Sequence, residues 1–406
     1  MELMTKQGYK QTEVGLIPED WSVEPIGDLA SISTGGSDTQ DRIDDGAYPF
    51  FVRSQTIERI NQFSFDGEAI LTSGDGVGVG KIFHYVNCKF DYHQRVYNIH
   101  NYRNDVAGKY LFFQFSTNFF ERVMAMTAKS SVDSVRREMI ADMQIPIPPT
   151  LTEQKAIATA LSDVDALIAS LEQTITKKKA IKQGAMQQLL TPPHKGGKRL
   201  PGFSGEWVEK TLGKVANYQN GKALESYFNS SDGYKVVSIG NYSESGIYVN
   251  NNNFISKTLK SEIGKFILNE GELAMLLNDK TSIGTIIGRV LYIDKNEEYV
   301  FNQRTMRLSL NEGYNSRFLF HLINCNIVHQ QIFLKAKPGT QIYINTADVL
   351  DLVLALPSSL EEQKAIAQIL SDMDAEITQL ETKKEKYQAI KQGMMQELLT
   401  GKTRLV

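Results

Sequence analysis

One long segment of this chain occurs twice. The 39 residues from Glu153 to Thr191 return as Glu362 to Thr400, shifted by 209 positions without a gap and with 25 of the 39 residues identical. A chain that repeats a long segment in this way has an internal pseudo-two-fold plan, so it presents alone what a symmetric dimer presents with two copies. Because palindrome-reading proteins use such symmetry on DNA, the repeat points toward an object with two related ends.

The repeated segment has the apolar spacing of a coiled-coil helix, with steps of four and three residues. The seam positions are Ile157, Leu161, Val164, Ile168, Leu171 and Ile175 in the first copy, and Ile366, Leu370, Met373, Ile377 and Leu380 in the second. The seam weakens at Lys178 and Lys182 and resumes toward Leu189. About 40 helical residues extend roughly 60 Å. Each stripe needs a partner, so the sequence predicts that the two helices pair with each other.

Chain connectivity predicts the orientation of this pair. A whole domain separates the end of one helix from the start of the next, so an antiparallel coiled coil would carry one globular domain at each end. The alternative is that the helices pair with a second molecule. The carboxylates of Asp163, Asp165, Asp372 and Asp374 are expected on the solvated outer face.

The repeat extends to the rest of the chain. Trp21 and its neighbours reappear 186 positions later at Trp207, whereas His93-Gln94-Arg95 is echoed by Asn302-Gln303-Arg304, and Pro148 by Pro357, at the full shift of 209. The predicted parts are a first domain at 1–150, a first repeat helix at 151–191, a linker at 192–200, a second domain at 201–358, a second repeat helix at 359–400 and a tail at 401–406. Short strand-like stretches followed by aromatic-rich helical stretches, at 110–123 and 318–334, predict a mixed α/β (α+β) fold for both domains.

Composition restricts the class of protein. No apolar run approaches the roughly 18 residues of a membrane span, the opening residues have no signal-peptide core, and the two cysteines, Cys88 and Cys325, indicate no disulfide framework. We therefore expect a cytoplasmic protein without a membrane partner. The net charge of −3 is unusual for a DNA-binding protein, so any contact with phosphates must come from local basic faces or from partner subunits.

Three catalytic or cofactor motifs fail on inspection. The glycine run Gly74 to Gly80 before Lys81 lacks the spacing of a P-loop and is followed by Ile82, so we interpret it as a turn that lets backbone approach a partner. His321, Cys325 and His329 are spaced at four residues, but no fourth ligand stands out, and an ordinary helix face is the preferred interpretation. The chain also lacks the Asn/Asp-Pro-Pro-aromatic motif of amino-methyltransferases.

Several side chains are candidates for contact with nucleic acid. Arginine and glutamine make bidentate contacts to bases, and lysine, serine and tyrosine hold phosphates. The candidates are Lys81, Gln94, Arg95, Lys129, Ser130, Arg136 and Arg137 in the first domain, and Lys280, Gln303, Arg304, Lys335, Lys337, Gln341 and Tyr343 in the second. For any one of them an ordinary surface role is the competing interpretation.

Three stretches resemble the type I restriction-modification specificity subunits. They are the opening Tyr9 to Trp21, the helix start from Ile147 to Lys155, and the restart from Arg199 to Trp207. The resemblance spans essentially the whole chain in the expected order. It implies two target-recognition domains joined by an antiparallel coiled coil, each domain reading one half of a bipartite sequence in double-stranded DNA. Ile157, Leu161, Ile366 and Leu370 then carry over as scaffold positions.

The resemblance also implies partners. In that family the helices hold two modification subunits, which bind S-adenosylmethionine and methylate adenine, and motor-nuclease restriction subunits join for cleavage. The chain itself is then a noncatalytic recognition subunit without cofactor or metal. Two rival hypotheses stay open: a noncatalytic protein-assembly scaffold with a coiled-coil spacer, and a methyltransferase in its own right.

Overall fold

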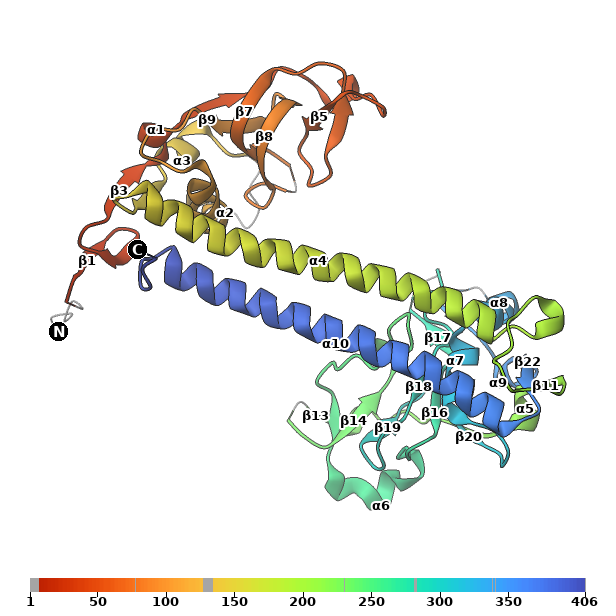
Figure 1. The fold of residues 1–406 in the computed structure, drawn as a ribbon. Coiled ribbons are helices and arrows are strands. Elements are labelled where there is room, and N and C mark those ends of the chain that lie inside the picture. Colours follow the sequence, from red (N-terminus) through yellow and green to blue (C-terminus); the bar gives the residue numbers. More distant parts are fainter. Residues whose placement is uncertain are drawn as a thin grey trace. The chain divides into compact units, whose positions relative to one another are not determined.

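The computed structural model describes residues 7–76, 78–126, 134–229, 231–280, 283–337, 339 and 341–405. The chain divides into two compact units. The first contains Met1–Glu172 and Lys383–Val406, and the second contains Gln173–Thr382. Each unit holds one globular domain together with a part of both long helices (Figure 1).

The first domain is built on a six-stranded sheet. Its order is β4 (Ser31–Thr34), β9 (Val96–His100), β7 (Phe65–Ser73), β8 (Phe83–Tyr92), β5 (Tyr48–Phe51) and β6 (Glu58–Ile60). Neighbouring strands are antiparallel except β5 and β8, which are parallel. Helix α2 (Gly108–Met126) packs on β7 and β8, where Phe115 stacks edge-on against Phe83 at 5.4 Å between ring centroids. The aromatic residues expected to form a helix here therefore build the core.

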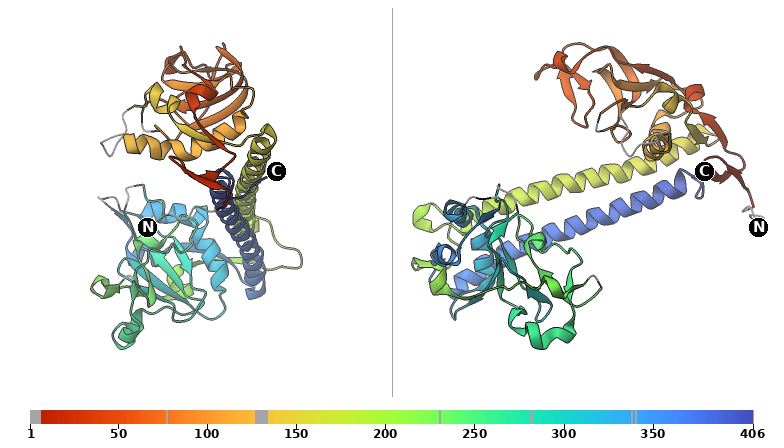
Figure 2. Two further views of the ribbon diagram at one scale, coloured as in Figure 1. Left: turned by 90° about the vertical axis from the view of Figure 1, so that its left-hand side faces the viewer. Right: turned by 180° about the vertical axis from the view of Figure 1, so that it is seen from behind.

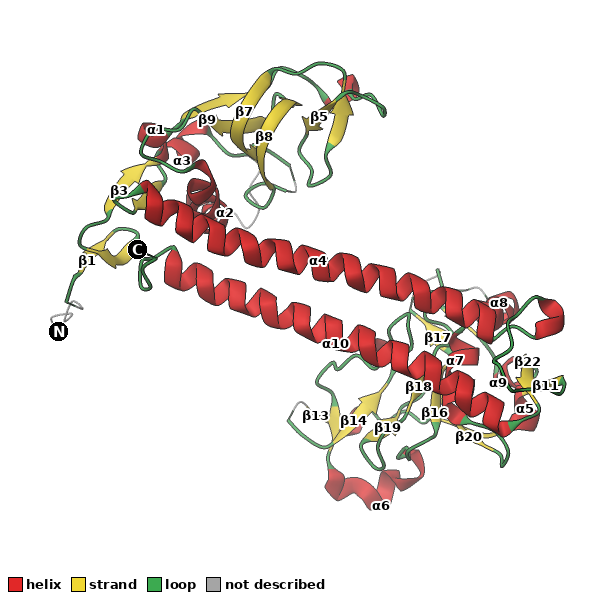
Figure 3. Cartoon of the chain, in the orientation of Figure 1, coloured by secondary structure: helices red, strands yellow, loops and turns green. Residues whose placement is uncertain are grey.

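The second domain repeats this plan. One sheet has the order β12 (Ala216–Asn220), β20 (Thr305–Leu310), β16 (Leu273–Leu276) and β18 (Val290–Tyr292), which matches β4-β9-β7-β8. A second sheet has the order β13 (Phe228–Asn229), β15 (Phe254–Ile255), β14 (Tyr234–Val237) and β19 (Tyr299–Phe301). Its β14 and β19 are parallel, as β5 and β8 are. The short helix α6 is Lys260–Ile263. The mixed α/β class predicted for both domains is confirmed (Figure 3).

A short strand pair leads into each long helix. β10 (Gln144–Ile147) pairs with β3 (Ser22–Pro25), and β22 (Val353–Pro357) pairs with β11 (Trp207–Thr211). The flanking helices are α1 (Ile26–Leu29) and α3 (Arg137–Ala141) in the first unit, and α5 (Leu212–Val215) and α9 (Thr346–Leu350) in the second. The buried Gln154 amide donates to the carbonyl of Pro148 at 3.1 Å, and the buried Gln363 amide donates to that of Pro357 at 3.0 Å. These repeated glutamines tie each long helix to its domain.

The prediction of one helical stretch at 318–334 is wrong in one respect, because this segment forms two helices. α7 (Ser316–Asn324) and α8 (Asn326–Lys335) are separated by Cys325, whose ψ of 157° is extended. Asn324 exchanges two hydrogen bonds with the backbone of Val290 on β18, at 2.9 and 3.0 Å. We attribute the break to this bonding of the α7 end to the sheet edge. As a result, His321, Cys325 and His329 do not share one continuous helix face.

The two repeat helices are α4 (Leu151–Leu189) and α10 (Leu360–Leu398). They run side by side and antiparallel in each unit (Figures 1 and 2). Ion pairs establish the register: Glu172 with Lys384 and Asp165 with Lys391 in the first unit, at 3.7 and 2.6 Å, and Lys178 with Glu376 in the second, at 2.6 Å. In these pairs, a lower residue number on α4 goes with a higher residue number on α10, as an antiparallel pair requires.

The seam positions are buried or half-buried along both helices. Ile157, Leu161, Leu171, Ile175, Ile366, Leu370 and Ile377 are buried, whereas Val164, Ile168, Met373 and Leu380 are half-buried. The first two positions of each copy also belong to the core of the adjoining domain. The seam therefore has two roles. Its first two positions pack in the core of a domain, and its later positions face the other helix.

Charged residues take over where the apolar seam weakens. Lys182 forms an ion pair with Asp374 within the second unit, and the equivalent Lys391 and Asp165 pair within the first. Asp163 and Asp372 are exposed, as expected for an outer face, but Asp165 and Asp374 are not simply solvated. Lysines that interrupt the heptad pattern thus contribute contacts between the helices.

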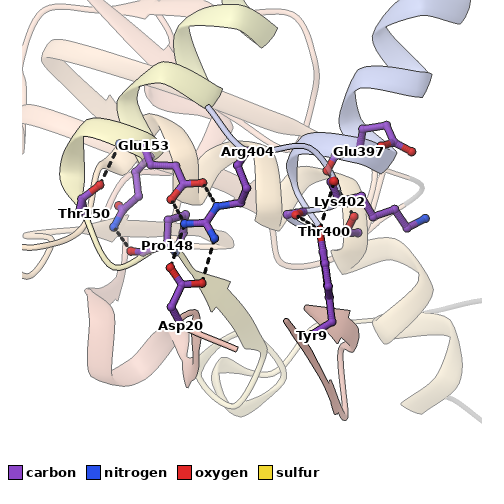
Figure 4. A network of polar contacts seen from close by, with 11 residues as sticks. Tyr9, Asp20, Pro148, Thr150, Glu153, Glu397, Thr400, Lys402 and Arg404 are labelled. Carbon is purple, nitrogen blue, oxygen red and sulfur yellow. Dashed lines mark hydrogen bonds and ion pairs between the residues drawn. The ribbon is translucent and has the colours of Figure 1, made fainter. Parts of the chain in front are cut away.

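The two ends of the chain meet in the first unit. Arg404 donates to Asp20 near the N-terminus at 2.9 Å and to Glu153 at the start of α4 at 2.8 Å (Figure 4). The Tyr9 hydroxyl on β1 (Tyr9–Thr12), which pairs with β2 (Gly15–Pro18), donates to the carbonyl of Gly401 at 3.1 Å. In the second unit Arg199 binds Glu362, the repeat equivalent of Glu153, at 2.7 Å. An arginine of the tail therefore pairs with the glutamate at the start of α4, and an arginine of the linker pairs with the equivalent glutamate of α10.

Candidate nucleic-acid interface

Each domain carries a tight Gln-Arg turn at the end of its sheet. The first Gln-Arg turn is residues 93–95, between β8 and β9, and the second is residues 302–304, between β19 and β20. The leading residue of each turn, His93 or Asn302, is buried, and its backbone N–H bonds to β5 or β14 at 2.9 Å. The following glutamine and arginine are exposed in both turns. The fold thus presents the side chains best suited to base contacts.

Two further segments line up beside each turn. In the first domain the backbone N–H of Gly74 bonds to the carbonyl of Arg95 at 2.7 Å, and the N–H of Val135 bonds to the carbonyl of Gly74 at 2.7 Å. In the second domain Leu277 bonds to Arg304 at 2.8 Å, and Ile344 bonds to Leu277 at 2.9 Å. Both domains therefore build one three-segment surface from the turn, a central loop and the segment before α3 or α9.

The first glycine of the run beginning at Gly74 is explained by this arrangement. A Cβ atom at position 74 would lie 2.8 Å from the carbonyl oxygen of Arg95, which is closer than side-chain atoms ordinarily approach backbone. The close approach at Gly74 is therefore made within the chain itself, and an approach of this backbone to a partner stays a prediction. The run then leads into strand β8, where a P-loop would require a helix.

Positive charge gathers on the three-segment surface of the first domain. Arg53 and Arg95 share Asp75 on the central loop, at 2.9 and 3.8 Å. Arg136 and Arg137 are exposed at the start of α3. Four arginines, two of them paired with Asp75, are thus gathered around this surface in a chain of net negative charge.

Two other predicted residues of the first domain, Lys129 and Ser130, lie outside the described residues. Lys81 is placed differently, with its ammonium 4.8 Å from the ring centre of Phe120 on α2.

The second domain brings most of its predicted residues together. Gln303, Arg304 and Lys280 line one cavity of about 290 Å³. The Arg304 guanidinium donates to the side-chain oxygen of Gln341 at 2.7 Å, and β17 (Asn278–Asp279) pairs with β21 (Ile342–Tyr343). Lys337 is exposed and its backbone pairs with that of Tyr343, whereas Lys335 is the half-buried last residue of α8.

Two carboxylates and one arginine on these surfaces were missed by sequence reasoning. Asp38 accepts from the Gln94 amide at 2.9 Å, and Glu225 accepts from the Gln303 amide at 2.6 Å. The two acids follow β4 and β12 in stretches of unlike sequence, and Arg53 follows β5, so no shared spacing could have identified them. The hydrogen bond from the Asn302 side chain, above all, lowers the pKa of Glu225, which keeps that carboxyl ionised.

The described residues contain no group of three or more His, Cys, Asp or Glu side chains that could hold a metal ion. His321 is buried, its Nε2 lies 3.2 Å from the Ser371 hydroxyl, and burial lowers its pKa to about 3. His84 and Cys88 lie on β8, where Cys88 is exposed. Of the helices in the described part, none is long and apolar enough to cross a bilayer.

Comparison with known proteins identifies the class. The family model described as "Type I restriction modification DNA specificity domain" matches twice, at residues 18–183 and 204–392. The chain belongs to this family. The MjaVIII specificity subunit of a type I restriction enzyme from Methanocaldococcus jannaschii is 27% identical over 100% of this chain and 98% of its own length. The EcoDI specificity subunit from Escherichia coli is 30% identical over 42% of this chain and 36% of its own length.

Solved structures share the fold. The S subunit of the type I restriction-modification system from M. genitalium superposes with a TM-score of 0.68 at 15% identity, covering 98% of both chains. A structure described as concerned with complex assembly and conformational transition of the type I system gives a TM-score of 0.51 over 95% of this chain. The expected class, a specificity protein with two target-recognition domains and no catalytic activity of its own, is confirmed by the family match and the relatives.

Proposed function

We propose that each globular domain reads one half of a bipartite sequence in double-stranded DNA through its three-segment surface. The observation that supports this most is the repetition of the Gln-Arg turn. Both domains expose a glutamine and an arginine at the same topological position, with the guanidinium held near the central loop or the segment beside it. The surrounding side chains differ between the domains, as two different half-sites require.

Domain exchange tests this division of labour. Replacing residues 1–150 with the equivalent domain of another specificity subunit should change one half of the recognised sequence and leave the other unchanged. Sequencing methylated adenines in DNA exposed to the reconstituted complex provides the measurement. A change in both halves would contradict independent reading, and sequence-independent binding by the complex would favour the assembly-scaffold alternative.

We propose that the repeat helices hold two modification subunits, which bind S-adenosylmethionine and methylate adenine. Motor-nuclease restriction subunits join for cleavage in the cytoplasm. Identical exposed residues on both helices support this. Ile181 and Ile390 occupy equivalent positions of the two copies, and these apolar side chains are 47% and 39% exposed. Small residues flank each isoleucine, with Ala180 and Gly184 exposed in the first copy and Ala389 and Gly393 in the second. Two identical faces suit two copies of one partner.

Stoichiometry tests this assignment. Ile181→Glu and Ile390→Glu should each reduce the complex to one modification subunit, and the double variant should bind none, as measured by native mass spectrometry. Ile43→Glu, at an isoleucine of the first domain that is 43% exposed, is the control and should leave two subunits bound. Retention of both subunits by the double variant would remove these faces from the interface.

A further inference from the structure

Each Gln-Arg turn is held by a carboxylate that arrives from a different part of the sheet. Asp38 begins a short 3₁₀ turn after β4, and Glu225 begins one after β12. The Asp38 carboxylate accepts from Gln94 at 2.9 Å and lies 4.0 Å from the His93 ring. The Glu225 carboxylate accepts from Gln303 at 2.6 Å and from Asn302 at 2.9 Å. Both acids therefore face the first two residues of their turn.

Each loop passes close to the backbone at its turn or at the residue just before it. A Cβ at Gly35 would lie 1.8 Å from the carbonyl oxygen of Tyr92, and one at Gly221 would lie 2.0 Å from that of Asn302. Glycine is thus required at both crossings. In the first domain Asp38 follows Gly35 by three residues, and in the second domain Glu225 follows Gly221 by four. A carboxylate meets the glutamine amide in both domains from two unlike sequences, which indicates that the contact itself is what both domains need.

A carboxylate beside a glutamine amide determines which way the amide faces. An ionised carboxylate has acceptors and no donor, so the amide atom at hydrogen-bond distance must be the nitrogen. The carbonyl oxygen of the exposed glutamine is then not the atom that meets the acid, so it is left to accept a hydrogen bond from a partner. On a surface that meets phosphates, a negative charge is electrostatically unfavourable. A role in orienting the glutamine explains why each surface has a carboxylate despite this cost.

We infer that Asp38 and Glu225 are specificity-determining positioning residues, which hold Gln94 and Gln303 with the carbonyl oxygen presented to DNA. This inference rests on the proposed reading of DNA by the two domains. In the major groove adenine and cytosine present amino donors, whereas guanine and thymine present keto acceptors at the corresponding position. A glutamine with an outward carbonyl oxygen selects an amino base. The neighbouring Arg95 or Arg304 supplies donors for a guanine edge or a phosphate.

The test uses the reconstituted complex and a DNA library with randomised half-sites. Asp38→Asn and Glu225→Gln keep the size of each side chain, but an amide both donates and accepts, so either orientation of the glutamine is satisfied. Each variant should lose preference for an amino over a keto base at one position of its own half-site, by roughly 2- to 12-fold, the range of one hydrogen bond. The other half-site should be unchanged. Asp44→Asn and Glu312→Gln, at exposed acids in the same domains, are the charge-matched controls and should leave every position unchanged.

Gln94→Ala and Gln303→Ala separate the possible failures. The inference requires each of them to relax the same position as the acid variant of its domain. Unchanged base preference in the acid variants, or relaxation spread over a whole half-site, would overturn the positioning role. If the glutamine variants also leave preference unchanged while domain exchange still alters one half-site, the turns do not read bases but the domains do. If domain exchange alters nothing, the proposed function itself fails.

Discussion

Two buried glutamates mark the starts of the long helices, and each is neutralised by an arginine from elsewhere in the chain. Glu153 and Glu362 are 1% and 0% exposed, and their partners are Arg404 and Arg199. A buried carboxylate that loses its arginine partner is costly, because the charge is left without solvent or cation. These contacts therefore contribute to coupling the tail to the first unit and the linker to the second.

We expect Arg404→Ala to destabilise the first unit by about 2–4 kcal/mol, below the upper range for breaking a buried pair because Arg404 is itself partly exposed. Asp20→Asn, which removes only the exposed partner of the same arginine, should cost less than about 1 kcal/mol. Urea unfolding of the full chain, with hydrogen exchange locating the loss, measures both effects. Equal costs for the two variants would contradict the importance of Glu153.

The arginines and lysines of the three-segment surfaces should divide into two kinds of DNA contact. Arg304→Ala should cost about 1–3 kcal/mol and relax one base position, because Arg304 follows Gln303, the residue proposed to read a base. Lys337→Ala should leave sequence preference unaltered and reduce the log-log salt slope by roughly 0.9, as loss of one phosphate contact does. Binding titrations at several salt concentrations distinguish them. Variants of Arg136 and Arg137 without effect on affinity, slope or preference would remove that segment from the interface.

At the scale of elements, the coiled coil is specified partly by charge. Lys182 with Asp374 and Lys391 with Asp165 are the same pair separated by the repeat period, each within its own unit. A lysine at a weak seam position suppresses an apolar stripe that would accept other partners, and its ion pair favours the antiparallel register. The helices thus gain orientation where they lose apolar contact.

A charge reversal measures this contribution. Lys391→Glu should destabilise the helix pair of the first unit by about 1 kcal/mol, and Asp165→Lys should do the same, because each places like charges together. The double reversal should restore most of the loss. A double-mutant cycle from denaturant unfolding provides the coupling energy. Additive losses would show that the two residues contribute independently.

At the scale of the whole molecule, we predict that the length of the repeat helices sets the spacer between half-sites. The first seam positions pack in the domain cores, so a heptad must be removed further along, for example residues 170–176 together with 379–385. Seven residues keep the seam in phase and shorten each helix by about 10 Å. The preferred spacer should contract by roughly three base pairs, with one half-site turned by about 100°.

Selection from a library of varied spacers decides this prediction. The shortened chain must first be shown to fold and to recruit its modification subunits, since a loss of assembly would mimic a loss of binding. A folded and active complex that prefers the original spacer would show that the helices do not determine the distance.

The amino-acid sequence alone determined the repeat, the long helices and the mixed class of the domains. These features depend on local periodicity, since apolar spacing specifies a helix face wherever the segment lies. The Gln-Arg turns were also visible, because Gln94-Arg95 and Gln303-Arg304 recur at the repeat period.

Only the tertiary structure decided which distant residues meet. Asp38 and Glu225 reach their glutamines across the sheet from unlike sequences, Arg404 crosses from the tail to Glu153, and Asn324 ends α7 through Val290 on β18. Each of these contacts joins residues far apart in the chain, and a side chain's neighbours across a sheet depend on strand order and register rather than on sequence spacing. Local patterns therefore predicted the elements, whereas packing between them determined the surfaces that carry the proposed specificity.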